Sequence, residues 1–257
     1  DVYKRQVWHY HFGRGIVDTP NDFGRIGSKP THPQLLDWLA VWFRDSGGSI
    51  KDLHRLILNT ATYKQVSNHH QGNAAIDISN KYLWRQNRRR LDAESLRDSV
   101  LIVSGKMNYE MGGPSFKDFV IEKPQHSPHY QYHKYDPDDP STHRRSVYRF
   151  IVRSQPQPFM DTFDCADPSQ LVDKRGETTT ALQALALLNN NFMVKMSQRF
   201  AENVSKNSNP DRKAFEMALS RVPTKDEFDL LNSYEKRHGL AATCRIIFNL
   251  NEFSFID

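Results

Sequence analysis

Apolar side chains recur at helical spacing near both ends of the chain. Between residues 31 and 46 they fall three or four positions apart, the period of one helix face, at Leu35, Leu36, Trp38, Leu39 and Trp42. Similar stripes run through 50–57, 93–103, 182–186, 192–204, 228–234 and 240–247. This pattern predicts helical segments over 7–105 and 177–257.

Capping residues mark where these helices begin and end. Side chains of Ser, Thr, Asp and Asn can accept the free N–H groups of a first helical turn, and Gln or Glu three positions later completes a capping box. The predicted starts are Thr31–Gln34, Ser49, Asp92, Thr180–Gln183, Asn209–Pro210 and Thr224–Glu227. The predicted stops are Gly47–Gly48, Gly105 and Gly239.

The middle of the chain, 106–176, has a different pattern and is rich in proline. Residues 147–153 alternate between apolar and polar positions and predict a strand, with 119–121 as a weaker partner. A mobile loop is expected from His126 to His143. The predicted fold class is mainly α with a small β hairpin or sheet in the middle, as one orthogonal helical domain over 7–257, with 106–176 as a loop and strand insertion.

Composition supports a folded chain with an ordinary surface. Of 257 residues, 38% are hydrophobic and 25% are charged, which argues against disorder. The net charge is +5, with 35 basic and 30 acidic residues interleaved, so a general polyanion-binding surface is not indicated. No apolar run approaches the roughly 20 residues that cross a bilayer.

Two cysteines, Cys165 and Cys244, lie far apart, and the sequence contains no CxxC or CxxCH motif. They can form one disulfide or remain two thiols. Residues 1–6 (DVYKRQ) look like a translated sequencing-adapter remnant, so we exclude them from fold reasoning. The natural sequence is then expected to begin near Val7 and to be truncated upstream.

Five blocks of sequence resemble a known family. They are WHYHFGRGIVDTPNDFG at 8–24, HPQLLDWLA at 32–40, the segment from Trp84 through NRRRLDAE at 87–94, QAL and LLNN within 183–190, and NLNEF at 249–253. In order and spacing they are similar to the planctomycete-type PSD domain, domain of unknown function 1553. The segment 165–175 departs from the family pattern.

The resemblance implies a context for the chain. Such domains form the C-terminal part of large bacterial proteins that carry a signal peptide and a cytochrome c-like region. It therefore implies missing upstream domains, a periplasmic or secreted location, and other domains of the same polypeptide as partners. Haem c would belong to those upstream domains. We expect no cofactor in this chain itself, because it lacks CxxCH.

The best candidate ligand-binding residues lie in and beside the first glycine-rich loop. Carboxylates and imidazoles close together suit general acid–base chemistry, whereas Arg–carboxylate pairs also hold loops in place. Both interpretations stay open for His9, His11, Arg14, Asp18, Asp22 and Arg25. The glycines of this loop match neither a dinucleotide fingerprint nor a P-loop and are expected to form turns with positive φ.

Two further clusters suggest chemistry less strongly. His126, His129, His133 and His143 lack a zinc motif, so we predict a polar loop and no metal site. Arg85 and 88–90 lie beside Tyr82 and Trp84, which can indicate nucleic-acid binding. Ion pairs with Asp92, Glu94 and Asp98 are the favoured interpretation, and a nucleic-acid partner is not expected.

Three functions remain from the sequence. The leading one is a non-catalytic domain of a secreted or periplasmic multidomain protein linked to cytochrome c-like modules. The alternatives are a hydrolase, perhaps polysaccharide-directed, that uses Asp18, Asp22 and His9, and a nucleic-acid-binding module. No catalytic residue is assigned.

Overall fold

A computed structural model describes residues 2–122, 127–170, 172 and 174–256. Asp1, Pro124 and His126, which entered the predictions above, lie outside these residues. The chain divides into two compact units, each described by itself. Within the described residues, the first unit runs to Arg89 and includes 172, 174 and 256, and the second holds the rest.

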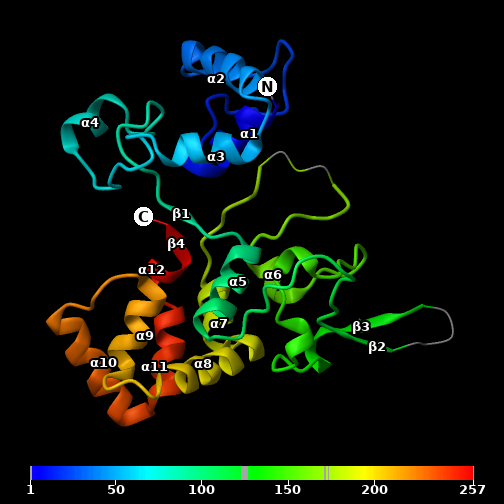
Figure 1. The fold of residues 1–257 in the computed structure, drawn as a ribbon, viewed down its shortest axis with the longest axis vertical. Coiled ribbons are helices and arrows are strands. Elements are labelled where there is room, and N and C mark those ends of the chain that lie inside the picture. Colours follow the sequence, from blue (N-terminus) through cyan, green and yellow to red (C-terminus); the bar gives the residue numbers. More distant parts are fainter. Residues whose placement is uncertain (1, 123–126, 171, 173, 257) are drawn as a thin grey trace. The chain divides into compact units, whose positions relative to one another are not determined.

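The first unit is built from short helices around one apolar core (Figure 1). Its helices are α1 (Val2–Phe12), α2 (Pro33–Asp45), α3 (Ile50–Leu58) and α4 (Gln71–Ile76). Phe12, Leu53 and Ile57 are almost fully buried there, so the core joins α1 to α3. Residues 2–6, excluded above, form the start of α1, and Gln6 Nε2 donates a hydrogen bond to Asn21 Oδ1 at 3.0 Å.

Two helix starts were predicted in this unit, and one of them has the predicted cap. Ser49 accepts the backbone N–H of Asp52, as predicted. The capping box at Thr31 and Gln34 was wrong, because α2 begins one residue later with His32 as its N-cap. The hydroxyl of Thr31 instead bonds to Ile16 O at 3.2 Å and to His32 Nδ1 at 2.8 Å.

The glycines of the first loop also differ from the prediction. The loop contains Gly13, Gly15, Gly24 and Gly27, and of these only Gly13 has a positive φ, of +70°. Gly27 is needed for a close approach instead, because a Cβ there would lie 2.5 Å from Asp22 O. Lack of a side chain, more than left-handed backbone, therefore explains this glycine.

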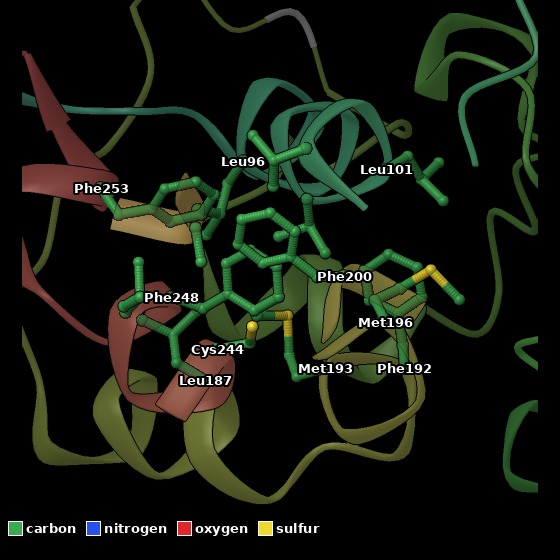
Figure 2. Packing of buried hydrophobic residues seen from close by; sticks show 14 of the residues in the cluster. Leu96, Leu101, Leu187, Phe192, Met193, Met196, Phe200, Cys244, Phe248 and Phe253 are labelled. Atoms are coloured by element: carbon green, nitrogen blue, oxygen red, sulfur yellow. The ribbon is translucent and has the colours of Figure 1, made fainter. Parts of the chain in front are cut away.

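The second unit packs helices around a large apolar core. They are α5 (Ala93–Val103), α6 (Pro158–Thr162), α7 (Ala181–Asn189), α8 (Asn191–Val204), α9 (Pro210–Leu219), α10 (Lys225–His238), α11 (Leu240–Phe248) and α12 (Asn251–Ser254). Figure 2 shows Phe200 of α8 and Phe248 of α11 among the side chains that fill the core, and their rings stack 5.4 Å apart. Leu96 of α5 completes this layer, fully buried.

The helix starts predicted for this unit are mostly confirmed. Asp92 accepts the N–H of Ser95, and Thr180 with Gln183 and Thr224 with Glu227 form complete capping boxes. Asn209 precedes Pro210 at the start of α9, but its side chain makes no cap hydrogen bond. Local sequence thus placed these boundaries because a cap acts within a few residues.

The mainly α fold with small β elements is confirmed. A hairpin joins β2 (Val120–Glu122) to β3 (His129–Gln131), antiparallel, with Ile121 opposite Tyr130. A second two-stranded sheet pairs β1 (Arg89–Arg90) with β4 (Phe255–Ile256). The predicted strand residues 119–121 therefore overlap β2, but their partner is β3.

The strand predicted at 147–153 was wrong. Its first residues form the 3-10 helix η3 (Ser146–Tyr148), and Arg149 makes only an isolated bridge with Phe116. Asp98 of α5 anchors its start by accepting the backbone N–H and the hydroxyl of Ser146 at 2.8 and 2.7 Å, and Phe116 makes backbone hydrogen bonds with Tyr148 and Phe150 at 3.0 and 2.8 Å. Apolar and polar residues therefore alternate in this segment although it forms no strand of a sheet.

The loop predicted from His126 to His143 also contains ordered elements among its described residues. After β3 come the 3-10 helices η1 (Tyr132–Lys134) and η2 (Pro140–Thr142). His143 is 3% exposed, and its Nε2 lies 2.9 Å from Pro137 O. This histidine is part of the packing and not of a mobile polar loop.

Candidate functional site

Arg14 makes two contacts that organise the loop singled out from the sequence, one to a carboxylate and one to a backbone carbonyl group. Arg14, just after α1, pairs with Asp18 at 2.7 Å, and its other terminal nitrogen reaches Ser79 O at 3.5 Å. The side chain of Asp18 is 48% exposed, so this is a surface ion pair of modest energy. The contact with Ser79 O links this loop to a distant segment of the first unit.

The other predicted members of this loop serve local partners or face solvent. Asp22 Oδ1 accepts the backbone N–H of Gly24 at 2.9 Å, which closes a turn within the loop. The side chain of Arg25 is exposed. The two carboxylates of the hydrolase hypothesis thus have different neighbours.

The two histidines of α1 lie in different surroundings. His11 Nε2 lies 2.7 Å from Nδ1 of His54 on α3, with the ring of Tyr63 edge-on at 5.5 Å. Burial, together with the nearby His54 and Arg89, lowers the pKa of His11 to about 4. His9 contacts the ring of Tyr10 instead, at 5.9 Å.

A histidine with so low a pKa is neutral at physiological pH. It can accept or donate one hydrogen bond, but it cannot serve as a cationic acid near neutrality. Of the predicted site residues, the structure brings Arg14 and Asp18 into contact. His11 contacts His54, which was not among the predicted site residues.

A small cavity in the second unit was not predicted from the sequence. Its volume is about 160 Å³, and its polar lining includes Arg149, Gln157, Asp161, Cys165 and Asp167. Apolar side chains, among them Met160, form much of the remaining wall. It lies between η3 and α6 and the segment that follows α6.

Cys165 is a partly buried free thiol at the edge of this cavity. Burial raises its pKa, and the negative charge of Glu94 raises it further. The thiol donates to Glu94 Oε1 at 3.6 Å, and that carboxylate also binds both terminal nitrogens of Arg175, at 3.1 and 2.8 Å. Since the thiolate is the nucleophile, this environment disfavours nucleophilic chemistry at Cys165.

Asp118 is the most deeply buried carboxylate near this cavity, at 2% exposure. Burial raises its pKa, while the charges of Arg149 and Arg97 act in the opposite direction. Among the described residues, Asp118 Oδ1 and Arg149 Nε are buried without a hydrogen-bond partner. Arg144 Nε, in the same unit, is also buried without a hydrogen-bond partner among the described residues.

Three buried arginines hold backbone carbonyl groups in the second unit. Arg97 of α5 donates to Arg144 O at 3.0 Å and to Thr142 O. Arg144 donates to Pro114 O at 2.6 Å and to Glu110 O at 3.3 Å. Arg90 donates to Phe163 O at 3.2 Å and pairs with Asp164 at 2.6 Å.

These contacts explain how a segment with little secondary structure stays folded. Buried carbonyl groups must be hydrogen-bonded, and a guanidinium offers five donors in a fixed fork. The local ion pairs predicted between Arg90 of the basic cluster and Asp92, Glu94 or Asp98 differ from the pairs observed. Arg90 pairs with the distant Asp164, and Glu94 pairs with the distant Arg175.

Neither site has the geometry of a metal centre. Across the described part of the chain, no group of three or more His, Cys, Asp or Glu side chains is arranged to hold a metal ion. Within the same residues, none of the helices is long and apolar enough to cross a membrane. Both cysteines are free thiols, which settles the choice left open by the sequence.

The lining of this cavity falls within residues 149–168, but no sequence motif marks that stretch as a site. Arg149 was assigned to a strand face, and no motif marks Cys165. Gln157, which caps α6 by accepting the N–H of Met160, also lines the cavity. Only the fold brings these residues together.

Fold and sites together define a helical domain whose charged side chains mainly bind other parts of the chain. A family model confirms the resemblance: it is described as PSD1, protein of unknown function (DUF1553), and matches residues 2–234. The chain belongs to this family. Comparison with curated proteins and with solved structures finds no match.

Proposed function

We propose that this chain is a non-catalytic domain of a secreted or periplasmic multidomain bacterial protein, in which it supports cytochrome c-like modules of the same polypeptide. The observation that carries the non-catalytic part is the commitment of Arg90, Arg97 and Arg144 to backbone carbonyl groups. Groups engaged in this way hold the fold and are not free to bind a reacting substrate.

The candidate residues of the first loop support the same proposal. Arg14 and Asp18 bind each other, and Asp22 closes its own turn. In the second unit, the raised pKa of Cys165 keeps its thiol protonated. The cytochrome c-like partners and the location outside the cytoplasm rest on the family resemblance alone.

The proposal that the first loop is structural and not catalytic is tested by replacing Asp18 and Asp22 together. Asp18→Asn with Asp22→Asn removes an exposed ion pair and a turn contact, so we expect the free energy of unfolding to fall by about 1 kcal/mol. Urea unfolding measures this, with Asp37→Asn as a control at an exposed carboxylate in α2.

The hydrolase alternative makes the opposite prediction. If Asp18 and Asp22 are catalytic, the double variant keeps its stability and loses hydrolysis of a panel of polysaccharides that the unchanged protein cleaves. Cleavage by the unchanged protein that the double substitution abolishes would contradict the non-catalytic proposal.

The partner proposal is tested on the complete source gene. We expect its product, made with a cytochrome c maturation system, to be exported and to show a Soret band from covalent haem. A complete gene product that stays in the cytoplasm and binds no haem would contradict this part of the proposal.

A further inference from the structure

The small cavity of the second unit has two side chains of opposite charge in its lining, Arg149 and Asp161. Arg149 directly follows η3, and Asp161 lies in α6. Among the hydrogen bonds and ion pairs of the described residues, none involves the guanidinium of Arg149 or the carboxylate of Asp161. The two groups therefore line one cavity without pairing with each other.

The other polar groups of the lining have partners within the chain. Gln157 binds the backbone N–H of Met160, Cys165 donates to Glu94, and Asp167 accepts from Ser169. These contacts cap α6, hold the thiol and close a turn. Arg149 and Asp161 are thus the charged groups of this lining that are able to bind a ligand.

The guanidinium of Arg149 is half-buried, and its Nε is buried without a hydrogen-bond partner among the described residues. A buried donor in this state costs free energy. Asp118 attracts Arg149, but Asp118 Oδ1 also lacks a partner among those residues, so these two atoms do not bond to each other. A carboxylate binds a guanidinium through two parallel hydrogen bonds. The carboxylate of a ligand would therefore supply the acceptor that Nε lacks.

Negative charge gathers at the mouth of the same cavity. Asp161 and Asp167 are exposed there, together with Ile151 and Pro168. A positively charged group of a ligand is attracted to these carboxylates and repelled by Arg149. A ligand that carries both a carboxylate and an ammonium group therefore matches the lining better than a ligand with a single charge.

The inner wall of the cavity is apolar. Val152 and Met160 line it and are 6% and 1% exposed. The volume of about 160 Å³ is close to that of an apolar cavity of roughly 150 Å³ that holds one benzene molecule. The space is therefore large enough for a small molecule with a short aliphatic side chain and too small for an oligosaccharide or a folded peptide.

From these observations we propose that the cavity binds a free α-amino acid with a short apolar side chain. Its carboxylate binds Arg149, its ammonium group lies at Asp161, and its side chain packs against Val152 and Met160. The site is separate from the proposed support of cytochrome c-like modules. Either proposal can fail while the other holds, because amino-acid binding requires neither haem nor export.

A nitrogen–proton NMR titration of the protein tests the proposal. The probes are L-alanine, L-valine and L-leucine, with L-valinamide, which lacks the carboxylate, and N-acetyl-L-valine, which lacks the ammonium group. We expect at least one of the three amino acids to bind and to move the Nε–H signal of Arg149, which is identified by its loss in Arg149→Gln. Valinamide should bind at least about tenfold more weakly than valine, because it makes no charged bond to Arg149. N-acetyl-L-valine should also bind more weakly than valine.

Variants locate the binding at this cavity. Arg149→Gln should raise the Kd at least about tenfold, and Asp161→Asn about threefold, because its carboxylate is exposed. Arg145→Gln makes the same charge change at an exposed residue of the same segment that does not line the cavity, and should leave the Kd unchanged. Ala166→Leu keeps every charge but fills part of the cavity, so it should weaken binding.

Four results would overturn the proposal: none of the three amino acids moves the Arg149 signal, valinamide binds as tightly as valine, Arg145→Gln weakens binding as much as Arg149→Gln, or Ala166→Leu leaves the Kd unchanged. Circular dichroism checks that each variant retains its fold. If Arg149→Gln fails to fold, the comparison of valine with valinamide still tests the contact with Arg149 in the unchanged protein.

Discussion

At the scale of single residues, the polar groups of this domain are distinguished by what they bind inside the chain. Arg97, buried at 5% exposure, lies over the rings of Phe116 and Phe192, at 5.0 and 5.5 Å. Burial lowers its pKa, and the charges of Tyr135 and Asp118 oppose that shift. Its hydrogen bonds to carbonyl groups make such burial tolerable.

His11 gives the domain a specific response to acid. Its pKa falls from the usual 6.5 to about 4 in the folded chain. The unfolded chain therefore binds more protons between these values, and folding stability must decrease as the pH falls from 6.5 towards 4. Above pH 6.5 the contribution is fully present.

We predict that His11→Gln reduces this acid sensitivity. Urea unfolding at pH 7 and at pH 5 should show a smaller loss of stability in the variant than in the unchanged protein. His133→Gln, at an exposed histidine, serves as the control and should keep the full loss. An equal loss in His11→Gln and the unchanged protein would exclude His11 as the source.

At the scale of elements, helix caps carry most of the information that the sequence reveals. Thr224 and Glu227 form a complete capping box at α10, and Arg221 binds the same carboxylate at 2.9 and 2.7 Å. The hydrogen bonds from Arg221 and from the backbone of Thr224 lower the pKa of Glu227 to about 2. The ionised Glu227 therefore stabilises the fold fully above its usual pKa of 4.5, and this stabilisation is lost as the pH falls towards 2.

Removing the cap should have a measurable cost. Thr224→Ala leaves the N–H of Glu227 without its partner, so we predict a loss of about 1 kcal/mol in the free energy of unfolding. Asn209→Ala is the matched control, because the side chain of Asn209 makes no cap bond at α9. Equal losses in the two variants, measured by urea unfolding, would contradict the role given to the cap.

The sequence predicted elements well where the cause is local. The caps at Ser49, Asp92, Thr180 and Thr224 act on residues three positions away. Such short-range patterns are visible in the sequence itself. The strand prediction at 147–153 was wrong because the conformation there depends on residues distant in sequence: Asp98, which binds the preceding Ser146, and Phe116, which bonds to Tyr148 and Phe150. Alternation of apolar residues alone does not distinguish a strand from such a segment.

The candidate sites were also predictable from the sequence only where the contacts are local. The pair of Arg14 and Asp18 is four residues apart and was within reach of the sequence. The cavity around Cys165 is lined by residues within 149–168, whose first part the sequence pattern assigned to a strand, so the cavity was recognised only in the fold. The lowered pKa of His11 depends on His54 and Arg89, which no local motif links to it.

At the scale of the whole molecule, each of the two units has its own apolar core. In the second unit, the helical core is joined to the long middle segment by charged side chains. Arg97 and Asp98 of α5 bind Thr142, Arg144 and Ser146, and Arg144 continues to Pro114. These contacts are structural, because they hold residues 110–114 and 142–146 against the helical core.

The measurement that tests this claim most directly is equilibrium urea unfolding of Arg97→Met. The variant keeps much of the side-chain volume but leaves buried carbonyl groups and the carboxylates near them without a partner. We predict a loss of about 3–5 kcal/mol, with little recovery in Arg97→Lys, and no more than about 0.5 kcal/mol in Arg44→Met at an exposed site. An Arg97→Met protein as stable as the unchanged chain would contradict the structural role of Arg97.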